Sequence, residues 1–387
     1  MKTPPAPLRH AWAGLLLLFA ATQPCRGQDG ADMGVPPAMG NAAASTEMPK
    51  PEKGNIFSQF FKAFNAMDTT YISPNRYNWA FMLQNTNSFE TYALHSRELG
   101  QKLSFSPKPA VKIGPYLGWR WIFLGYTFEV SSLGKGHESR KTELELSLYS
   151  AMLGCDLIYR RTGDDFRLRK AKGLGEAAKD VEGENCHGIN VKVTGINAYY
   201  IFNHKRFSYP AAFAQSTVQR KSCGSWKAGF SYTRHELDFN YDALPHALTQ
   251  NPGHELSQDF RIDKLKYDDY SISCGYAYNW VFKRNWLLCV SLAPAIGYKR
   301  TRSNVLPIET EDEEETPFWS SFFTLDNFNF DVTGRIGLVW NNTKYFGGLS
   351  LILHNYNYRH NRLSVNNTFG TLNFYVGLNF HKRKAYR

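Results

Sequence analysis

Apolar and polar residues alternate with a period of two along most of this chain, from about residue 80 to its end. A period of two places successive side chains on opposite faces of a β-strand. Between Tyr270 and Trp280, for example, large apolar residues alternate with Ser, Gly, Ala and Asn. Runs of this kind predict about 12 antiparallel strands. The expected strands are 82–94, 103–116, 119–131, 142–150, 152–162, 189–203, 225–241, 267–282, 285–302, 328–341, 344–358 and 370–381.

Two classes of protein share this alternation: a soluble β-sandwich, which buries its apolar faces, and a membrane barrel, which turns them toward lipid. The runs last about 10 residues or more, which is the length that a tilted strand needs to cross a bilayer. Aromatic residues stand at the ends of the apolar faces, as at Trp286 and Tyr298, and resemble an interfacial girdle. Small residues, rather than Lys and Glu, fill the opposite faces. The pattern therefore favours an all-β fold, a transmembrane antiparallel β-barrel.

The connections between the predicted strands agree with this interpretation. In bacterial outer-membrane barrels, short turns lie at one rim and long loops at the other. Segment 204–224 fits no strand and is expected to be an irregular excursion. Short links fall near 116–118, 282–285 and 340–344, whereas the long polar links are 132–141, 161–188, 242–266, 303–327 and 359–370.

The N-terminal region has a different character from the rest of the chain. Lys2 and Arg9 precede a short apolar run over 11–21, which predicts a secretory signal peptide over residues 1–27. A flexible lead-in is expected over 28–54, a periplasmic helix and linker over 55–77, and the barrel over 78–382. The helix is short and amphipathic, and two interpretations stay open: it packs on the edge of the domain, or it is an interfacial helix that lies on the membrane or caps the mouth of the barrel. Its apolar stripe is Ile56, Phe57, Phe60, Phe61, Phe64 and Met67.

Composition and charge narrow the location and the partners. Aromatic residues make up 15% of the chain and charged residues only 20%. Both values exclude a disordered chain. Loss of residues 1–27 would lower the net charge from +11 to +8, and the remaining basic excess is spread thinly. A nucleic-acid partner is therefore not expected. We expect export to the cell outer membrane, with membrane lipid, outer-leaflet glycolipid and envelope proteins as candidate partners.

Five cysteines follow the predicted signal peptide, and none of them forms a C-x-x-C pair. This spacing predicts neither a zinc site nor a complete disulfide framework. A bond between Cys186 and Cys223 stays open, because both lie in polar connecting segments. No cofactor is implied by any motif.

Several short motifs resemble an uncharacterised Bacteroidetes outer-membrane β-barrel family, known only as domain of unknown function 4421. The resemblance covers most of residues 68–382 and implies a barrel in the outer membrane. It implies no activity, substrate or catalytic residue. The motifs are DTTYI at 68–72, YNW at 77–79, MLQ at 82–84, GPYLGWRW at 114–121, LGY at 124–126, FSYPAAF at 207–213 and QST at 215–217.

Charged residues on the small-residue faces are candidates for lining the lumen. Buried charges are costly unless they are paired or hydrated. They therefore form either a salt-bridged plug or the wall of a water-filled passage. The sequence does not favour one of these over the other. The candidates are Glu143, Glu145, Lys227, Asp331 and Arg335.

The sequence offers only weak candidates for catalysis or metal binding. His354 and Ser350 share one face of a predicted strand, and at the lipid-facing rim they could serve a lipid hydrolase. The competing interpretation is a girdle histidine beside Tyr356 and Tyr358. The acidic run over 309–315 matches no calcium-loop spacing and is expected to be a solvated loop. We therefore assign no catalytic, cofactor or metal-binding residue and do not expect an enzyme.

Three functions remain compatible with this pattern. The first is a pore or transport protein for small solutes, as suggested by the polar inner face. The second is a non-conducting structural or partner-binding barrel of the envelope. The third, and least favoured, is an outer-membrane lipid-modifying enzyme.

Overall fold

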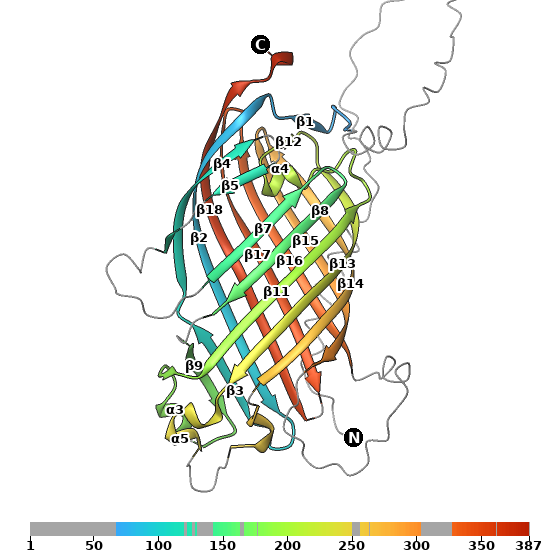
Figure 1. Ribbon diagram of the computed structural model, residues 1–387. Helices are drawn as coiled ribbons and strands as arrows, with labels where there is room; N and C mark the ends of the chain where they lie inside the picture. Colours follow the sequence, from blue (N-terminus) through green and yellow to red (C-terminus); the bar gives the residue numbers. More distant parts are fainter. Residues whose placement is uncertain are drawn as a thin grey trace, which may run out of the picture. The chain divides into compact units, whose positions relative to one another are not determined.

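The computed structural model describes residues 67–119, 122–125, 128–129, 142–162, 166–175, 177–249, 256–262, 264–302, 327–360 and 362–386. Strands dominate, and all of them belong to one compact unit (Figure 1). The strands are β1 (Ile72–Pro74), β2 (Tyr77–Ser96), β3 (Lys102–Pro107), β4 (Ala110–Trp119), β5 (Ile122–Gly125), β6 (Phe128–Glu129), β7 (Thr142–Tyr149), β8 (Leu153–Arg161), β9 (Phe166–Lys172), β10 (Asn185–Cys186), β11 (Ile189–Ile201), β12 (Thr217–Gln219), β13 (Cys223–Phe239), β14 (Lys264–Lys283), β15 (Trp286–Thr301), β16 (Phe328–Asn341), β17 (Tyr345–His360) and β18 (Leu363–Lys382).

The helices are short and lie at the ends of the sheet. None of the described helices is long and apolar enough to cross a membrane. The predicted helix within 55–77 falls largely on residues 55–66, which lie outside the described part of the chain. The described helices are α3 (Ala177–Asp180), α4 (Pro210–Phe213), η3 (Tyr241–Ala243), α5 (His246–Thr249), η4 (Gln258–Phe260) and η7 (Lys384–Tyr386).

The long strands form one antiparallel sheet with a nearly sequential order. From β4 the order runs β2, β18, β17, β16, β15, β14, β13, β11, β8 and β7. Strands β5 and β6 add to the other side of β4, and β9 pairs with β3 at one end of the sheet. Within the described residues the sheet is not closed, because β7 pairs there only with β8. The segment that joins β6 to β7 lies outside the described residues.

The sheet is strongly curled, as contacts between its inward side chains show. Arg335 on β16 forms an ion pair with Asp156 on β8, although four strands lie between them in the sheet order. Arg160 on β8 likewise pairs with Glu90 on β2 at 3.1 Å. Figure 1 shows the strands tilted and wrapped around a common interior. Contacts across this interior, and not a second sheet, bury the inward face.

The distribution of side chains is the reverse of that in a water-soluble sandwich. Ile272, Ile296 and Val376 point outward and are 72%, 62% and 63% exposed. Asp269 and Lys299 point inward and are almost completely buried. An exposed apolar belt around a polar interior is typical of a barrel whose outer surface meets lipid. The predicted fold class is therefore confirmed, including which residues of β14, β15, β16 and β18 face outward.

Each of the 12 expected strands has a counterpart, but the boundaries differ in three places. The expected strand 103–116 is divided into β3 and β4, and residues 119–131 give the short strands β5 and β6. The long loop expected over 359–370 is wrong, because β17 and β18 pair through this region up to His360 and Leu363.

Amide side chains on the outer face explain why the sequence pattern predicts a loop at the end of this hairpin. Asn355 donates to Thr368 at 2.7 Å, and Asn366 donates to Asn357 at 2.6 Å, across the two strands. The register places these residues directly opposite one another. Cross-strand polar pairs replace apolar residues here, so the hydrophobic alternation fades although the strands continue.

The two ends of the interior are filled by different segments. At the loop end, β9, α3, α5 and η4 contribute to an apolar cluster that includes Phe105, Phe166, Phe239, Leu248 and Phe260. We call this cluster the apolar cap. At the end with short turns, residues 204–219 fold inward and carry α4 against β15 and β16. We call this segment the inner plug; it is part of the stretch that the sequence pattern predicts only as an irregular excursion.

Candidate functional site: the charged interior

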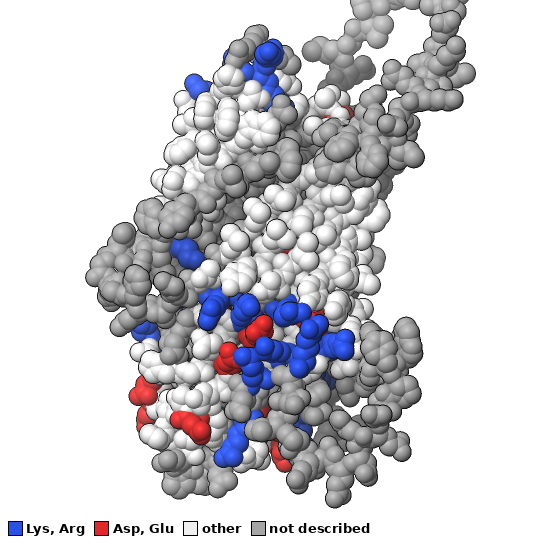
Figure 2. Space-filling model, in the orientation of Figure 1, with Lys and Arg blue, Asp and Glu red and all other residues white. Residues whose placement is uncertain are grey.

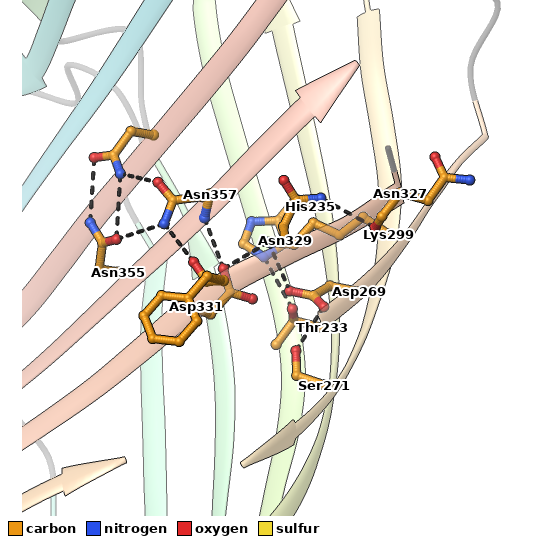
Figure 3. A network of polar contacts seen from close by, with 12 residues as sticks. Thr233, His235, Asp269, Ser271, Lys299, Asn327, Asn329, Asp331, Asn355 and Asn357 are labelled. Atoms are coloured by element: carbon orange, nitrogen blue, oxygen red, sulfur yellow. Dashed lines mark hydrogen bonds and ion pairs between the residues drawn. The ribbon is translucent and has the colours of Figure 1, made fainter. Parts of the chain in front are cut away.

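Lys299 occupies the first of three ionic centres inside the curled sheet. Its ammonium nitrogen lies 3.2 Å from Asp269 Oδ2 and 2.9 Å from Asp331 Oδ1 (Figure 3). Ser271 donates a 2.7 Å hydrogen bond to Asp269, and the Asn357 backbone N–H donates a 2.8 Å bond to Asp331. One cation therefore serves two buried carboxylates, which come from β14 and β16 on either side of its own strand, β15.

Arg335 forms the second ionic centre. Its guanidinium pairs with Asp156 and donates a 2.7 Å hydrogen bond to the Tyr149 hydroxyl. Asp156 also accepts hydrogen bonds from Ser147 at 2.6 Å and from Asn197 at 3.1 Å. Both charged side chains are at most 2% exposed. Pairing and hydrogen bonding together offset the cost of removing these charges from water.

The third centre joins the two sides of the interior near the apolar cap. Arg160 lies 3.1 Å from Glu90, and its guanidinium stands over the Phe369 ring at 4.6 Å from the centroid. Tyr92 donates a 3.3 Å hydrogen bond to the same carboxylate. The Arg335 and Arg160 centres bring together side chains from strands that are distant in the sheet, and they therefore hold opposite walls of the interior together. The Lys299 centre instead joins three neighbouring strands.

The inner plug is anchored to the wall by polar contacts. The Tyr209 hydroxyl donates to Ser291 at 2.9 Å and accepts from Lys227 at 3.2 Å. Asn279 on β14 donates to the Ser208 carbonyl at 2.8 Å. Gln215, at the other end of the plug, donates to the Tyr375 hydroxyl at 2.9 Å. The plug therefore contacts β13, β14, β15 and β18, and its aromatic side chains fill the space between them.

Within the described part of the chain, two cavities adjoin these groups. The larger, of about 470 Å³, lies beside the inner plug between β1 and the ends of β7 and β8, and its wall includes Tyr149, Phe207 and Thr217. The smaller, a polar cavity of about 30 Å³, lies between the Lys299 and Arg335 centres, and its wall includes Asp331, Arg335 and Lys227. A volume of this size holds about one water molecule. It is far below the size of a typical small-molecule pocket, which is about 300 Å³ or more.

Three of the five candidate lumen residues point into the interior of the sheet. Lys227, Asp331 and Arg335 are buried on the inward faces of β13 and β16. The side chains of Glu143 and Glu145, on β7, lie outside the described part of the structure. The sequence pattern does not single out the other interior charges. Three of them fall toward the ends of long strands, and Asp156 and Arg160 lie in β8, where the alternation is weak. These further residues are Glu90, Asp156, Arg160, Asp269 and Lys299.

The proposed hydrolase pair is not supported by its geometry. Ser350 and His354 do share a face, but this face points inward and both side chains are buried. His354 lies inside the sheet against the rings of Tyr356 and Phe369, so the girdle interpretation is also wrong. Four residues along one strand span about 13 Å, well beyond hydrogen-bond reach. Ser350 and His354 therefore do not form a nucleophile and its base.

Cys186 and Cys223 lie at opposite ends of the sheet. Both cysteines are free, Cys223 begins β13, and Cys186 lies three residues before Ile189, which pairs with the last residue of β13. The 17 residues of β13 separate them by roughly 50 Å. An intramolecular disulfide between them is excluded.

Cys186 is expected to react slowly with thiol reagents while the protein is folded. Burial in the apolar cap raises the pKa of its thiol to about 11, whereas an unfolded cysteine titrates near about 8.5. At about pH 8 the reactive thiolate should therefore be depleted roughly 200-fold in the folded state. Peptide mapping after brief maleimide treatment measures this, with urea-unfolded protein as the control. Equal labelling in both states would contradict the buried position.

The described residues contain no group of three or more His, Cys, Asp and Glu side chains that could hold a metal ion. The acidic run over 309–315 lies outside them. The interior instead consists of closed ion pairs, each held by protein groups.

The fold and its lipid-facing surface define a transmembrane β-barrel of the outer-membrane type. The chain belongs to the family described as Domain of unknown function (DUF4421), whose model matches residues 66–380. No curated protein matches the sequence.

Several solved outer-membrane proteins are similar in structure at low scores. The Escherichia coli outer membrane protease OmpT has a TM-score of 0.32 and 8% identity, over 80% of this chain and 98% of OmpT. Pseudomonas aeruginosa OprG gives 0.23 and 7%, over 80% and 98% of the two chains. The Pseudomonas putida toluene transporter TodX gives 0.19 and 10%, over 79% and 91%. The strands and side chains of this chain define its fold independently of these similarities.

Proposed function

We propose that this protein is a non-conducting barrel of the bacterial outer membrane, with a structural or partner-binding role. The proposal is carried by one observation: the interior is occupied along its length by the inner plug, the three ionic centres and the apolar cap. Residues 1–27 would direct export, and the rim with short turns would face the periplasm. Passage of a solute would require both the plug and the cap to leave their positions.

The energetics of the interior favour the closed state. Opening a path would separate groups such as Arg335 and Asp156, and each unpaired buried charge costs several kcal/mol. The inner plug would also lose its hydrogen bonds to Ser291, Asn279 and Tyr375. The candidate lumen residues Lys227, Asp331 and Arg335 thus act, in this proposal, as structural charges and do not select ions.

Conductance measurements test the proposal directly. Purified full-length protein in planar bilayers is expected to give no stepwise current at voltages up to about 100 mV of either sign. A voltage of about 100 mV changes the energy of one elementary charge that crosses the membrane by about 2.3 kcal/mol. Correct insertion is checked on the same sample by a gel shift between boiled and unboiled protein. A general porin in the same bilayers serves as the positive control.

Discrete current steps from folded protein would overturn the closed-barrel proposal and restore the pore function. A shortened-plug variant, which lacks residues 208–216, tests whether the apolar cap alone blocks the current. Because the apolar cap still closes the other end, this variant is also expected to stay silent. Conductance only after loss of the plug would show that the cap is permeable.

A further inference from the structure

An outward-facing aromatic row crosses the outer wall toward the loop end. Tyr232, Tyr270 and Tyr298 lie directly opposite one another on β13, β14 and β15. Phe328 on β16 continues the row. Tyrosines on a lipid-facing surface collect where the hydrocarbon meets the headgroups. The row therefore marks one membrane interface.

The next outward positions on the same strands carry charges. Two residues beyond the tyrosines stand Arg234, Asp268 and Arg300, which are again opposite one another. Asp268 is contacted by Arg234 at 2.9 Å and by Arg302. Within the described part of the chain, Arg300 has no ion-pair partner. A single carboxylate thus stands among three guanidinium groups.

A second charged row follows one step further along the strands. Arg161, Lys192, Glu236 and Lys266 are neighbours across β8, β11, β13 and β14. Glu236 lies 3.8 Å from Lys192 and 3.6 Å from Lys266, so it is shared between two lysines. Arg161 is exposed and has no ion-pair partner among the described residues.

We call these two rows, with Arg302, the basic belt: six cations around two carboxylates. Figure 2 shows Lys and Arg gathered there with few acidic side chains, beside a broad surface without charges. The paired cations remain accessible, with between 38% and 47% of each side chain exposed. The two carboxylates hold the cations in place without neutralising them.

We propose that the basic belt binds the phosphate groups of an anionic glycolipid in the leaflet that surrounds the loop end. Guanidinium groups match phosphate oxygens in a bidentate manner, and each further cation near an anionic surface strengthens the attraction. The aromatic row supplies the second half of the site, because the acyl chains of the same glycolipid would lie against it. A ligand with both parts fits better than free phosphate, which would use only the belt. The inference rests on the outer-membrane placement in the proposed function.

The test uses full-length protein in phosphatidylcholine vesicles that contain diphosphoryl lipid A. Lipid that stays bound after detergent extraction is counted by native mass spectrometry. We expect the protein to retain lipid A and to retain at least about fivefold less of the dephosphorylated lipid. Retention of lipid A should be lost at about 1 M salt, because the Debye length then falls to about 3 Å. Inorganic phosphate at about 10 mM is not expected to compete, because single exposed ion pairs are weak.

A triple variant and a matched control locate the site. Arg161→Gln, Lys192→Gln and Arg300→Gln together should reduce retention about tenfold or more, which corresponds to about 1.4 kcal/mol or more. The control carries Lys283→Gln, Arg284→Gln and Lys344→Gln, which remove the same charge at the opposite rim. It should retain lipid A as the unchanged protein does. The gel shift of unboiled samples verifies that both variants are folded.

Equal losses in the two variants, or equal retention of the phosphorylated and dephosphorylated lipids, would overturn the lipid site. Competition by inorganic phosphate would assign the belt to free anions instead. The outcome is independent of conductance: a conducting protein that retains lipid A refutes the closed barrel and leaves the lipid site standing. A silent protein without lipid retention refutes the lipid site and leaves the closed barrel standing.

Discussion

Replacing Arg335 with leucine is expected to lower the free energy of unfolding by about 3–5 kcal/mol. The change leaves Asp156 as an unpaired charge with 1% of its side chain exposed, and it removes the donor to the Tyr149 hydroxyl. Because these groups come from β16, β8 and β7, the loss weakens contacts across the whole interior. Urea unfolding in detergent, followed by tryptophan fluorescence, measures the change.

Two further variants separate the ion pair from general damage to the interior. The double change Arg335→Leu with Asp156→Leu removes both charges and should recover much of the lost stability. Arg284→Leu, at an exposed turn between β14 and β15, should change the free energy of unfolding by about 0.5 kcal/mol or less. If Arg335→Leu were as mild as Arg284→Leu, the buried pair would not stabilise the barrel.

Replacing Leu292 with arginine is expected to destabilise the inserted barrel by about 2–4 kcal/mol, the cost at the bilayer midplane. Leu292 is 38% exposed, stands midway between Trp286 and Tyr298 on β15, and lies opposite the outward Tyr276. In a water-soluble protein such an exposed position would accept arginine at little cost. In a bilayer the charge must leave water, so the same change becomes costly.

The matched control for this prediction is Leu99→Arg. Leu99 is 54% exposed but lies in the link between β2 and β3, beyond the strand ends. It should leave folding into lipid vesicles unchanged, as judged by the unboiled gel band. Equal tolerance of both substitutions would show that the outer surface faces water and would refute the membrane barrel.

The alternation of residues is sufficient to predict most of the strands because a barrel wall repeats one local rule. Each position of β14 from Tyr270 to Trp280 alternates between the outer surface and the interior. Such a pattern needs no knowledge of distant contacts. It fails at the end of the β17–β18 hairpin, where Asn355 and Asn357 replace apolar residues on the outer face.

The charged interior is only partly visible in the sequence. Arg335 and Asp331 are evident because they interrupt a face of small residues, but their partners are not. Asp156 lies 179 positions from Arg335, and no local spacing joins them. The inner plug shows the same limit, since the role of Tyr209 depends on Ser291 and Lys227.

The strands, their inward and outward faces and the polar character of the interior follow from the order of residues alone, because all three depend on a period of two. That the interior is filled follows only from the fold in three dimensions. Pairing of charges, seating of the plug and packing of the apolar cap all join residues that are far apart in the chain. Their free energy depends on distance in space, which the curl of the sheet sets and a linear pattern does not encode.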